Sequence, residues 1–266
     1  MLFPVDDTDI APDWHDPYPD PVIESHDGIL VVRDDLLGYG SKIRAADYLI
    51  GHDPTYAHVK EWVYGSCPAV GWAQISATYL ANRYGKTAVY FMAKRDMAKL
   101  HPAQRQGLAL GGDYRWVPNG MLSVTQRRAK DYVAEDPSTR ALLPIGLDHP
   151  TVVASFCRVA RQLPVKPAYV WSVGSSGTLS RGLQAAWPEA EVHMVTVGHT
   201  PSETQRGRAM VHRSPYAFDK PVKGDDVPPF DSAAEYDAKA WSVLRKWRDD
   251  HTIQEPILLW NVAGNL

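Results

Sequence analysis

In residues 38–50, GYGSKIRAADYLI, a glycine-rich turn leads directly into a helical pattern. Ser41 is a favourable N-cap, and Lys42 follows it in the first helical turn. The helix is predicted from apolar residues at helical spacing, namely Ile43, Ala46, Leu49 and Ile50. A cation at this place meets the positive end of the helix dipole, which lowers the pKa of the amine. Most lysines at helix starts are solvated surface charges, so the position alone does not assign a role.

The composition is that of a globular protein with a sizeable core. The chain has 266 residues, of which 44% are hydrophobic and 22% are charged, and its formal net charge is -3. Such a charge gives no overall basic field for nucleic acid. Cys67 and Cys157 form no spaced pair, and the cysteine and histidine spacings match no zinc template, so no metal site is predicted.

The N-terminus and the cysteine content predict a cytoplasmic protein. The first 21 residues are acidic and proline-rich, where a signal peptide would be basic and then apolar. No apolar run reaches the length of a membrane span. We therefore expect an unprocessed protein without membrane contact, in a reducing compartment.

Strand-like runs alternate with helical stretches along the chain, which predicts an α/β fold with a mainly parallel sheet. The predicted strands are 28–36 (ending in a turn), 87–93, 114–118, 141–146, 168–173 and 191–199. One predicted helix begins at Lys42, and another begins after residue 177. The other predicted helices cover 73–85, 102–112, 123–136 and 151–163. The clearest loop is 221–235.

The glycine-rich segment VGSSGTLSRG, residues 173–182, lies between a predicted strand and a predicted helix. Backbone N–H groups of such a turn can surround an anion, and the helix dipole favours a phosphate there. The segment has neither the Walker Gly-Lys-Ser/Thr nor the Rossmann glycine spacing, and the strand ending at Gly198 offers no acidic residue for a ribose. The alternative to a phosphate site is a tight turn that happens to be glycine-rich.

A lysine of lowered pKa and a separate phosphate site are together what an enzyme needs to hold pyridoxal phosphate as a Schiff base. Residues 31–50 (VVRDDLLGYGSKIRAADYLI) resemble the segment around the Schiff-base lysine of fold-type II pyridoxal-phosphate enzymes, in the branch of 1-aminocyclopropane-1-carboxylate deaminase and D-cysteine desulfhydrase. The resemblance continues in chain order through the segments 63–91, 142–163, 173–183, 235–244 and 258–266.

The resemblance implies a fold-type II α/β architecture with two domains. The expected large domain has a mainly parallel sheet, binds pyridoxal phosphate and comprises residues 1–58 and 138–266. The expected small, inserted α/β domain comprises residues 59–137. The resemblance also implies a homodimer.

By resemblance, Lys42 forms the Schiff base and moves the Cα proton of the substrate. Tyr236 matches a tyrosine near the cofactor that stacks or acts as an acid or base, although an aromatic residue packed in the core has the same appearance. The threonine expected near the pyridine nitrogen falls on Val262, which leaves Asn261 as the polar candidate for cofactor binding. By the same resemblance, the glycine-rich loop binds the cofactor phosphate, through Gly174, Ser175, Ser176, Gly177 and Thr178.

The segment that binds the substrate in the family departs from its pattern here. Where the family has Ser-Asn-His, this chain has Ala69, Val70 and Gly71, and Ser66 and Cys67 are the neighbouring candidates for substrate binding. Polar contacts to the substrate carboxylate normally decide which Cα bond stands perpendicular to the cofactor ring and breaks. A poorly solvated carboxylate makes its loss as carbon dioxide more plausible.

These observations lead to one expected function and two alternatives. The expected function is that of a pyridoxal-phosphate-dependent lyase, of the elimination or deamination type, that acts at Cα of an amino acid or amino-acid adduct. The first alternative is a decarboxylase of an amino-acid-modified nucleotide or thymine in bacteriophage DNA hypermodification. Basic clusters at 94–99, 125–130 and 205–213 would then contact phosphates, although such runs are usually solvated helix faces. The second alternative is a cofactor-binding protein that has lost catalysis.

Overall fold

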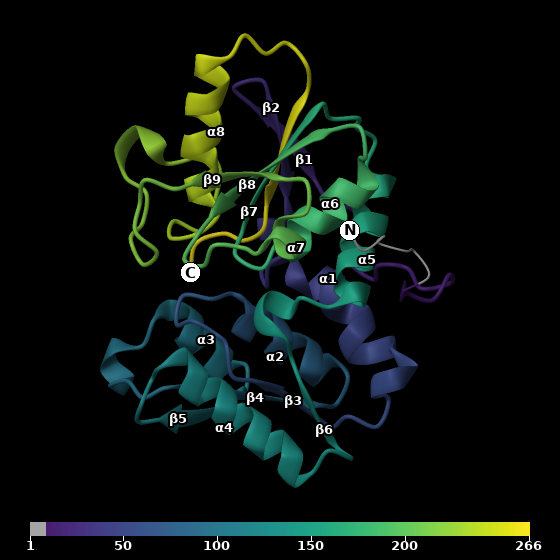
Figure 1. The fold of residues 1–266 in the computed structure, drawn as a ribbon, viewed down its shortest axis with the longest axis vertical. Helices are drawn as coiled ribbons and strands as arrows, with labels where there is room; N and C mark the ends of the chain where they lie inside the picture. The colour runs from purple at the N-terminus through teal and green to yellow at the C-terminus, as the bar shows by residue number, and fades with distance from the viewer. Residues whose placement is uncertain (1–8) are drawn as a thin grey trace. The chain divides into compact units, whose positions relative to one another are not determined.

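The structure, a computed structural model, describes residues 9–266 and divides into two compact units (Figure 1). Of the described residues, the first unit contains 9–45 and Pro150–Asn265, and the second contains Ala46–His149 and Leu266. The prediction about a signal peptide rests in part on residues 1–8, which lie outside the described residues.

The first unit is built on a six-stranded sheet in the order β1-β2-β10-β7-β8-β9. Only the β1–β2 pair is antiparallel, so the predicted mainly parallel sheet is confirmed. The predicted strand 28–36 is shorter than expected, because Asp34–Leu37 forms a 3₁₀ helix. The strands are β1 (Ile23–His26), β2 (Ile29–Arg33), β7 (Tyr169–Gly174), β8 (Glu191–Thr196), β9 (Met210–Arg213) and β10 (Ile257–Asn261).

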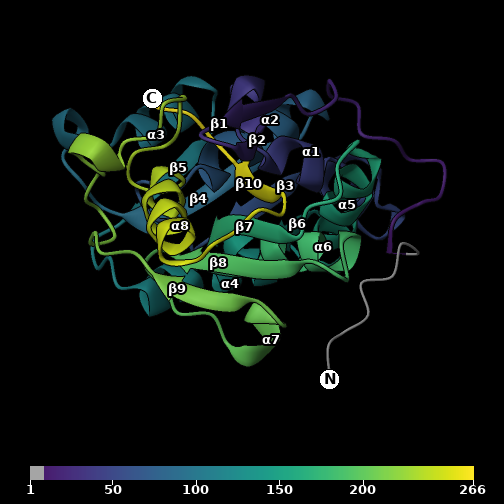
Figure 2. The same ribbon diagram turned by 90° about the horizontal axis from the view of Figure 1, so that it is seen from above.

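Helices cover both faces of this sheet, with α8 on one side and α5 and α6 on the other (Figures 1 and 2). Alternate strand residues face opposite sides. Leu259 packs with Trp241 of α8 in the main core cluster, whereas the ring of its neighbour Trp260 meets Phe156 of α5. The helices are α1 (Lys42–Asp47, which begins in this unit), α5 (Pro150–Gln162), α6 (Thr178–Ala186), α7 (Glu203–Arg206) and α8 (Ala238–Asp250).

The second unit has a four-stranded, entirely parallel sheet in the order β5-β4-β3-β6. One face packs on α4, where Val63 and Val89 contact Ala129, and the other carries the tyrosines that meet α2. The strands are β3 (Glu61–Tyr64), β4 (Thr87–Ala93), β5 (Asp113–Val117) and β6 (Arg140–Leu142). The helices are α2 (Ala73–Arg83), α3 (Pro102–Ala109) and α4 (Leu122–Glu135).

The boundaries of the second unit lie outside those expected for the small domain. Residues 46–58 and 138–149, which the sequence analysis assigns to the large domain, belong here to the second unit. The reason on the C-terminal side is that β6 pairs with β3, so the sheet itself extends to Leu142. The expected small domain 59–137 lies wholly inside this unit.

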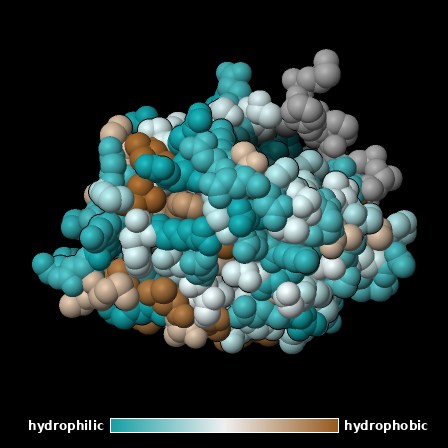
Figure 3. Space-filling view, turned by 90° about the horizontal axis from the view of Figure 1, so that it is seen from below, coloured by the Kyte–Doolittle hydropathy of each residue, from teal (hydrophilic) through white to brown (hydrophobic). Residues whose placement is uncertain are grey.

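The face of the molecule in Figure 3 is mainly hydrophilic. This face shows small hydrophobic patches separated by hydrophilic residues. Among residues 9–266, no helix is both long enough and apolar enough to cross a membrane. The same residues contain no group of three or more histidine, cysteine, aspartate or glutamate side chains arranged to hold a metal ion.

A histidine–tryptophan stack lies in the first unit between the sheet and α8. His193 of β8 is fully buried, and its Nδ1 lies 2.9 Å from Nε2 of His212 on β9. The ring of Trp171 stacks on His193 with centroids 4.2 Å apart, and the tilted ring of Trp247 of α8 lies next to both rings, 4.7 Å from His193 and 5.4 Å from Trp171. Nε2 of His193 lies 3.1 Å from a carboxylate oxygen of Glu191, but without the geometry of a hydrogen bond. Burial, followed by the charges of His212 and His251, lowers the pKa of His193 to about 3.

We expect this stack to make the fold acid-sensitive. Below pH 6.5 the unfolded chain protonates His193, whereas the folded state resists protonation down to about pH 3, so stability falls as the pH falls through this range. From pH 7 to pH 5 this one group should lower the free energy of unfolding by about 2 kcal/mol. Urea unfolding of His193→Gln should show a smaller loss over that range, whereas His58→Gln, an exposed control, should match the wild type. Identical pH slopes for wild type and His193→Gln would contradict the assignment.

Candidate active site

Lys42 is the first residue of α1 and is half-buried, as the sequence predicts for a lysine in a first helical turn. The backbone before it is fixed, because the N–H of Ser41 donates to the carbonyl oxygen of Val262 at 2.9 Å. The Ser41 hydroxyl, expected to cap the helix, accepts a 3.2 Å hydrogen bond from the indole of Trp260 and bonds Asp34. The start of α1 is therefore tied to the end of β10.

The residues Arg33, Asp34 and Asp35, which precede this helix, form buried ion pairs that hold the chain around Lys42. Arg33 makes a two-pronged contact with Asp35, at 2.9 and 2.8 Å. Arg44, only 1% exposed, pairs with Asp34 and with Asp16. Burial raises the pKa of Asp16 to about 6, against the opposing effect of Arg44. The residues that resemble the family motif here are therefore structural, since a buried pair is costly to break.

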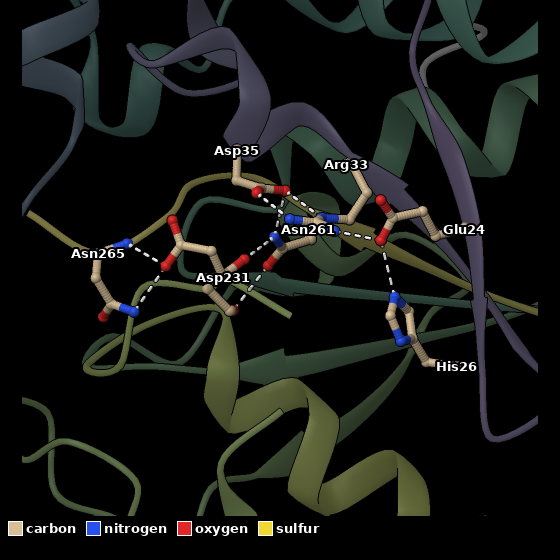
Figure 4. A network of polar contacts seen from close by, with 8 residues as sticks. Glu24, His26, Arg33, Asp35, Asp231, Asn261 and Asn265 are labelled. Atoms are coloured by element: carbon tan, nitrogen blue, oxygen red, sulfur yellow. Dashed lines mark hydrogen bonds and ion pairs between the residues drawn. The ribbon is translucent and has the colours of Figure 1, made fainter. Parts of the chain in front are cut away.

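Asn261 lies inside this network (Figure 4). Its Nδ2 donates to Oδ1 of Asp35 at 2.7 Å and to the carbonyl oxygen of Asp231 at 2.8 Å, and its Oδ1 accepts from Ser232 at 2.7 Å. These contacts use both N–H groups and the carbonyl of an amide that is 1% exposed. The structure gives Asn261 an internal bridging role in which both of its N–H groups are used.

The predicted phosphate loop joins β7 to the N-terminus of α6. Gly177 precedes the first helical residue with φ +70°, a left-handed conformation that glycine adopts readily. A Cβ at this position would lie 1.8 Å from the backbone oxygen of Gln205, so no side chain fits. The hydroxyls of Ser176 and Thr178 are buried and 2.8 Å apart. Backbone N–H groups at the start of α6 and these hydroxyls form a donor set that suits a phosphate.

Tyr236 and Asp237 connect this loop to Lys42 within the first unit. The hydroxyl of Tyr236 hydrogen-bonds the side chain of Ser175, and burial raises its pKa, so the phenol stays protonated. Asp237 is 2% exposed, and neither carboxylate oxygen makes a hydrogen bond of normal geometry. Burial raises the pKa of Asp237 to about 8, although backbone contacts with Val262 and Ala263 and the charge of Lys42 favour its ionised form. The charge of Lys42 thus acts on the carboxyl of Asp237, whose neighbour in the chain, Tyr236, interacts with Ser175 of the loop.

The sequence analysis missed Asp237. The only available signal was its position beside Tyr236 in a segment that resembles a family motif. Its burial could not be read from the sequence, because an aspartate before a helix is normally a solvated cap. A buried carboxylate is costly unless cations or donors stabilise its charge.

Because Asp237 is buried without a hydrogen bond of normal geometry, we expect Asp237→Asn to stabilise the cofactor-free protein. The folded state holds the proton of this carboxyl up to about pH 8, whereas the unfolded chain releases it near pH 4, so stability falls as the pH rises between these values. The variant should lack this slope and gain about 1–3 kcal/mol at pH 8. Chemical denaturation at pH 5 and pH 8 measures the effect, with the exposed Asp225→Asn as control. A loss of stability in Asp237→Asn at pH 8 would show that the carboxylate is satisfied inside the protein.

The five predicted substrate-binding residues all lie in the second unit, on the segment between β3 and α2. Their side chains are half-buried, and Ala69, Val70 and Gly71 provide no polar side-chain group. Ser66 Oγ accepts from the amide of Gln126 at 2.9 Å, and the thiol of Cys67 faces the carbonyl oxygen of Pro68 at 3.6 Å. The polar groups that this segment presents are therefore mainly those of its backbone.

Comparison with solved structures shows that the chain has a known fold. A crystal structure of an ACC deaminase homologue is similar with a TM-score of 0.78 and 16% identity, over 94% of this chain and 90% of that one. Threonine deaminase isoform 2 from Solanum lycopersicum has a TM-score of 0.70 and 15% identity, over 98% and 81% of the two chains. Diaminopropionate ammonia lyase from Escherichia coli, in its apo form, has a TM-score of 0.65 and 14% identity, over 93% and 83%.

No family model and no curated protein sequence matches the chain. At identities this low, structural likeness establishes the fold alone. The chain therefore has the fold-type II architecture, shared with the ACC deaminase homologue, that its sequence segments implied.

Proposed function

We propose that this protein is a pyridoxal-phosphate-dependent lyase that acts at Cα of an amino acid or amino-acid adduct. The observation that carries the proposal is the glycine-rich loop of the first unit, where Gly177 leaves no room for a side chain and the buried hydroxyls of Ser176 and Thr178 lie at the start of α6. In the same unit, the charge of Lys42 acts on the buried carboxyl of Asp237. The shared fold supports it, because an aspartate racemase of the same fold is named pyridoxal 5'-phosphate-dependent.

The residues of the first unit fit the chemical groups of this cofactor. The phosphate would be held at the start of α6, by Ser176, Gly177 and Thr178. The cationic ring nitrogen would meet the buried carboxylate of Asp237, which the protein itself leaves without a hydrogen bond of normal geometry. This contact replaces the one first predicted for Asn261, whose amide is already occupied. When bound, the cofactor supplies an aldehyde that bonds to an amine and a ring that takes up electrons from Cα.

The side chains around it would bind and move protons. Lys42 would hold the cofactor covalently through Nζ and, once released by the substrate amine, accept the Cα proton at the same atom. Tyr236 would donate a hydrogen bond through its hydroxyl, because its raised pKa keeps the phenol protonated. Asp237 would stay ionised beside the ring cation, which favours uptake of electrons by the ring.

The substrate carboxylate would bind the segment from Ser66 to Gly71 in the second unit. Since Ala69, Val70 and Gly71 offer no polar side-chain atoms, this segment would bind through backbone N–H groups. Amino-acid specificity would then depend on the direction in which these groups point.

The proposed function is tested by incubating the cofactor-loaded protein with a panel of D- and L-amino acids and 1-aminocyclopropane-1-carboxylate. Ammonia, 2-oxo acid and carbon dioxide are measured separately. Release of ammonia and a 2-oxo acid supports the lyase. A cofactor-loaded protein that releases none of the three from any amino compound is a binding protein without catalysis, which contradicts the proposal.

Decarboxylation of an amino acid carried on a nucleotide is the second candidate function. It is favoured by the apolar side chains of Ala69 and Val70 and by the charge of the second unit, in which basic residues outnumber acidic ones. Exposed cations suited to phosphates include Lys94, Arg95, Lys99, Arg128 and Lys130. Carbon dioxide release from thymidine that carries an amino acid on its base, without ammonia release from free amino acids, would select this function.

The homodimer and the cytoplasmic location stay predictions.

A further inference from the structure

The segment proposed to bind the substrate carboxylate is held by one buried side chain. Gln74, in the first turn of α2, is 0% exposed. Its Nε2 lies within hydrogen-bond distance of three backbone carbonyl oxygens, those of Gly71 at 2.8 Å, Ala69 at 3.0 Å and Pro68 at 3.4 Å. One amide group therefore fixes most of the turn before the helix.

A tyrosine in turn fixes the amide of Gln74. The hydroxyl of Tyr114 on β5 donates to Oε1 of Gln74 at 2.8 Å, which directs Nε2 toward the turn. Tyr114 is itself confined, because its hydroxyl fills the space that a Cβ at Gly107 would enter, 2.1 Å away. A second tyrosine, Tyr90, donates to the backbone carbonyl of Gln74 at 2.8 Å. The turn is thus connected to two strands of the sheet.

These contacts set the direction of the backbone N–H groups in the turn. A trans peptide points its N–H away from its C=O. Because the carbonyls of Pro68 and Ala69 point toward Gln74, the N–H groups of Ala69 and Val70 point away from it. Side chains cannot compensate for a change in this direction, since Ala69 and Val70 carry no polar side-chain atom.

We propose that Gln74, oriented by Tyr114, is a positioning residue that determines the affinity for the substrate carboxylate. The inference rests on the proposed function of the 66–71 segment. Gln74 does not touch the substrate: it acts by holding the peptide groups that do. Its loss should weaken amino-acid binding and leave cofactor loading unchanged, because the proposed cofactor-holding residues belong to the first unit.

The experiment uses Gln74→Leu, which keeps the size and removes the amide, and Tyr114→Phe, which keeps the ring and removes the hydroxyl. The control is Asn82→Ala on the same helix, an exposed residue whose amide donates to the carbonyl of Leu110. Each protein is loaded with pyridoxal phosphate and titrated with glycine, D-cysteine and 1-aminocyclopropane-1-carboxylate, while the cofactor absorbance is followed.

We expect cofactor loading to be equal in all four proteins. The amino-acid concentration for half-saturation should rise about tenfold or more in Gln74→Leu and less in Tyr114→Phe, as expected for the loss of buried hydrogen bonds. For the amino acid that is turned over, KM should rise more than kcat falls. Asn82→Ala should match the wild type.

Three results would overturn the positioning role: unchanged amino-acid affinity in Gln74→Leu, loss of cofactor loading in a folded Gln74→Leu, or a loaded wild type whose absorbance no amino acid changes. A wild type that does not load cofactor at all instead refutes the proposed function. A thermal melt of Gln74→Leu separates unfolding from loss of affinity, because an unfolded variant would also fail to load cofactor. If Gln74→Leu is unfolded, the amino-acid affinity of Tyr114→Phe alone decides whether Gln74 has the positioning role.

Discussion

Replacing Lys42 with alanine is expected to reduce turnover about 10³-fold or more, because the amine would both carry the cofactor and accept the Cα proton. The variant should still bind pyridoxal phosphate, since the phosphate loop and Asp237 are unchanged, but dialysis should remove the cofactor. Steady-state assays on the amino acid that the wild type turns over measure the first effect, and absorbance after dialysis measures the second.

Lys166→Ala is the matched control for this variant, because Lys166 is an exposed lysine of the same unit. It should behave as the wild type in both assays. Full turnover by Lys42→Ala would remove Lys42 from the reaction, whatever its position at the start of α1.

Replacing Gly177 with valine is expected to have the second largest effect, namely a loss of cofactor affinity of about 100-fold or more. The new Cβ would lie 1.8 Å from the backbone oxygen of Gln205, and a branched residue at φ +70° is strained in addition. The loop must move, and the N–H groups at the start of α6 would then lose their common direction. Since each 1.4 kcal/mol is a factor of ten, the loss of two charge-assisted hydrogen bonds gives this magnitude. Equilibrium dialysis with pyridoxal phosphate measures the affinity.

Gly224→Ala separates backbone strain from the clash. Gly224 also has a positive φ, +59°, but no atom lies within 4 Å of the point that a Cβ would occupy there. This variant should lose about 1 kcal/mol of stability and keep its affinity for the cofactor. Equal cofactor affinity in Gly177→Val and Gly224→Ala would contradict the assignment of the phosphate site.

The sequence predicted the regular elements well where local signals were strong. The glycine-rich loop between β7 and α6 and the helix that begins at Lys42 both follow from glycine chemistry and helical spacing, and both are confirmed. The short edge strands β1 and β9 and the strand β3 were not predicted, because a run of four residues carries little periodic signal. The RDD sequence was assigned to a strand and turn, whereas its acidic residues form a buried 3₁₀ turn satisfied by Arg33, Arg44 and Trp260.

The candidate site was only partly predictable. Lys42, Ser175 and Tyr236 lie far apart in the sequence, and only tertiary packing connects them through Asp237. Asn261 was chosen because it is polar and adjacent to Val262, but its hydrogen bonds are used inside the protein. Sequence position cannot distinguish an amide that is occupied from one that is available. For the same reason, Gln74 could be noted from the sequence only as a polar residue near the predicted substrate segment.

Borohydride reduction followed by peptide mapping tests the central claim most directly. The purified protein is incubated with pyridoxal phosphate, reduced, digested and analysed by mass spectrometry. We predict a phosphopyridoxyl group on Lys42 at near-stoichiometric yield, and a visible band near about 420 nm that disappears on reduction, as expected for an activated lysine. Modification spread over several surface lysines, or concentrated on another lysine with Lys42 unmodified, would contradict the account.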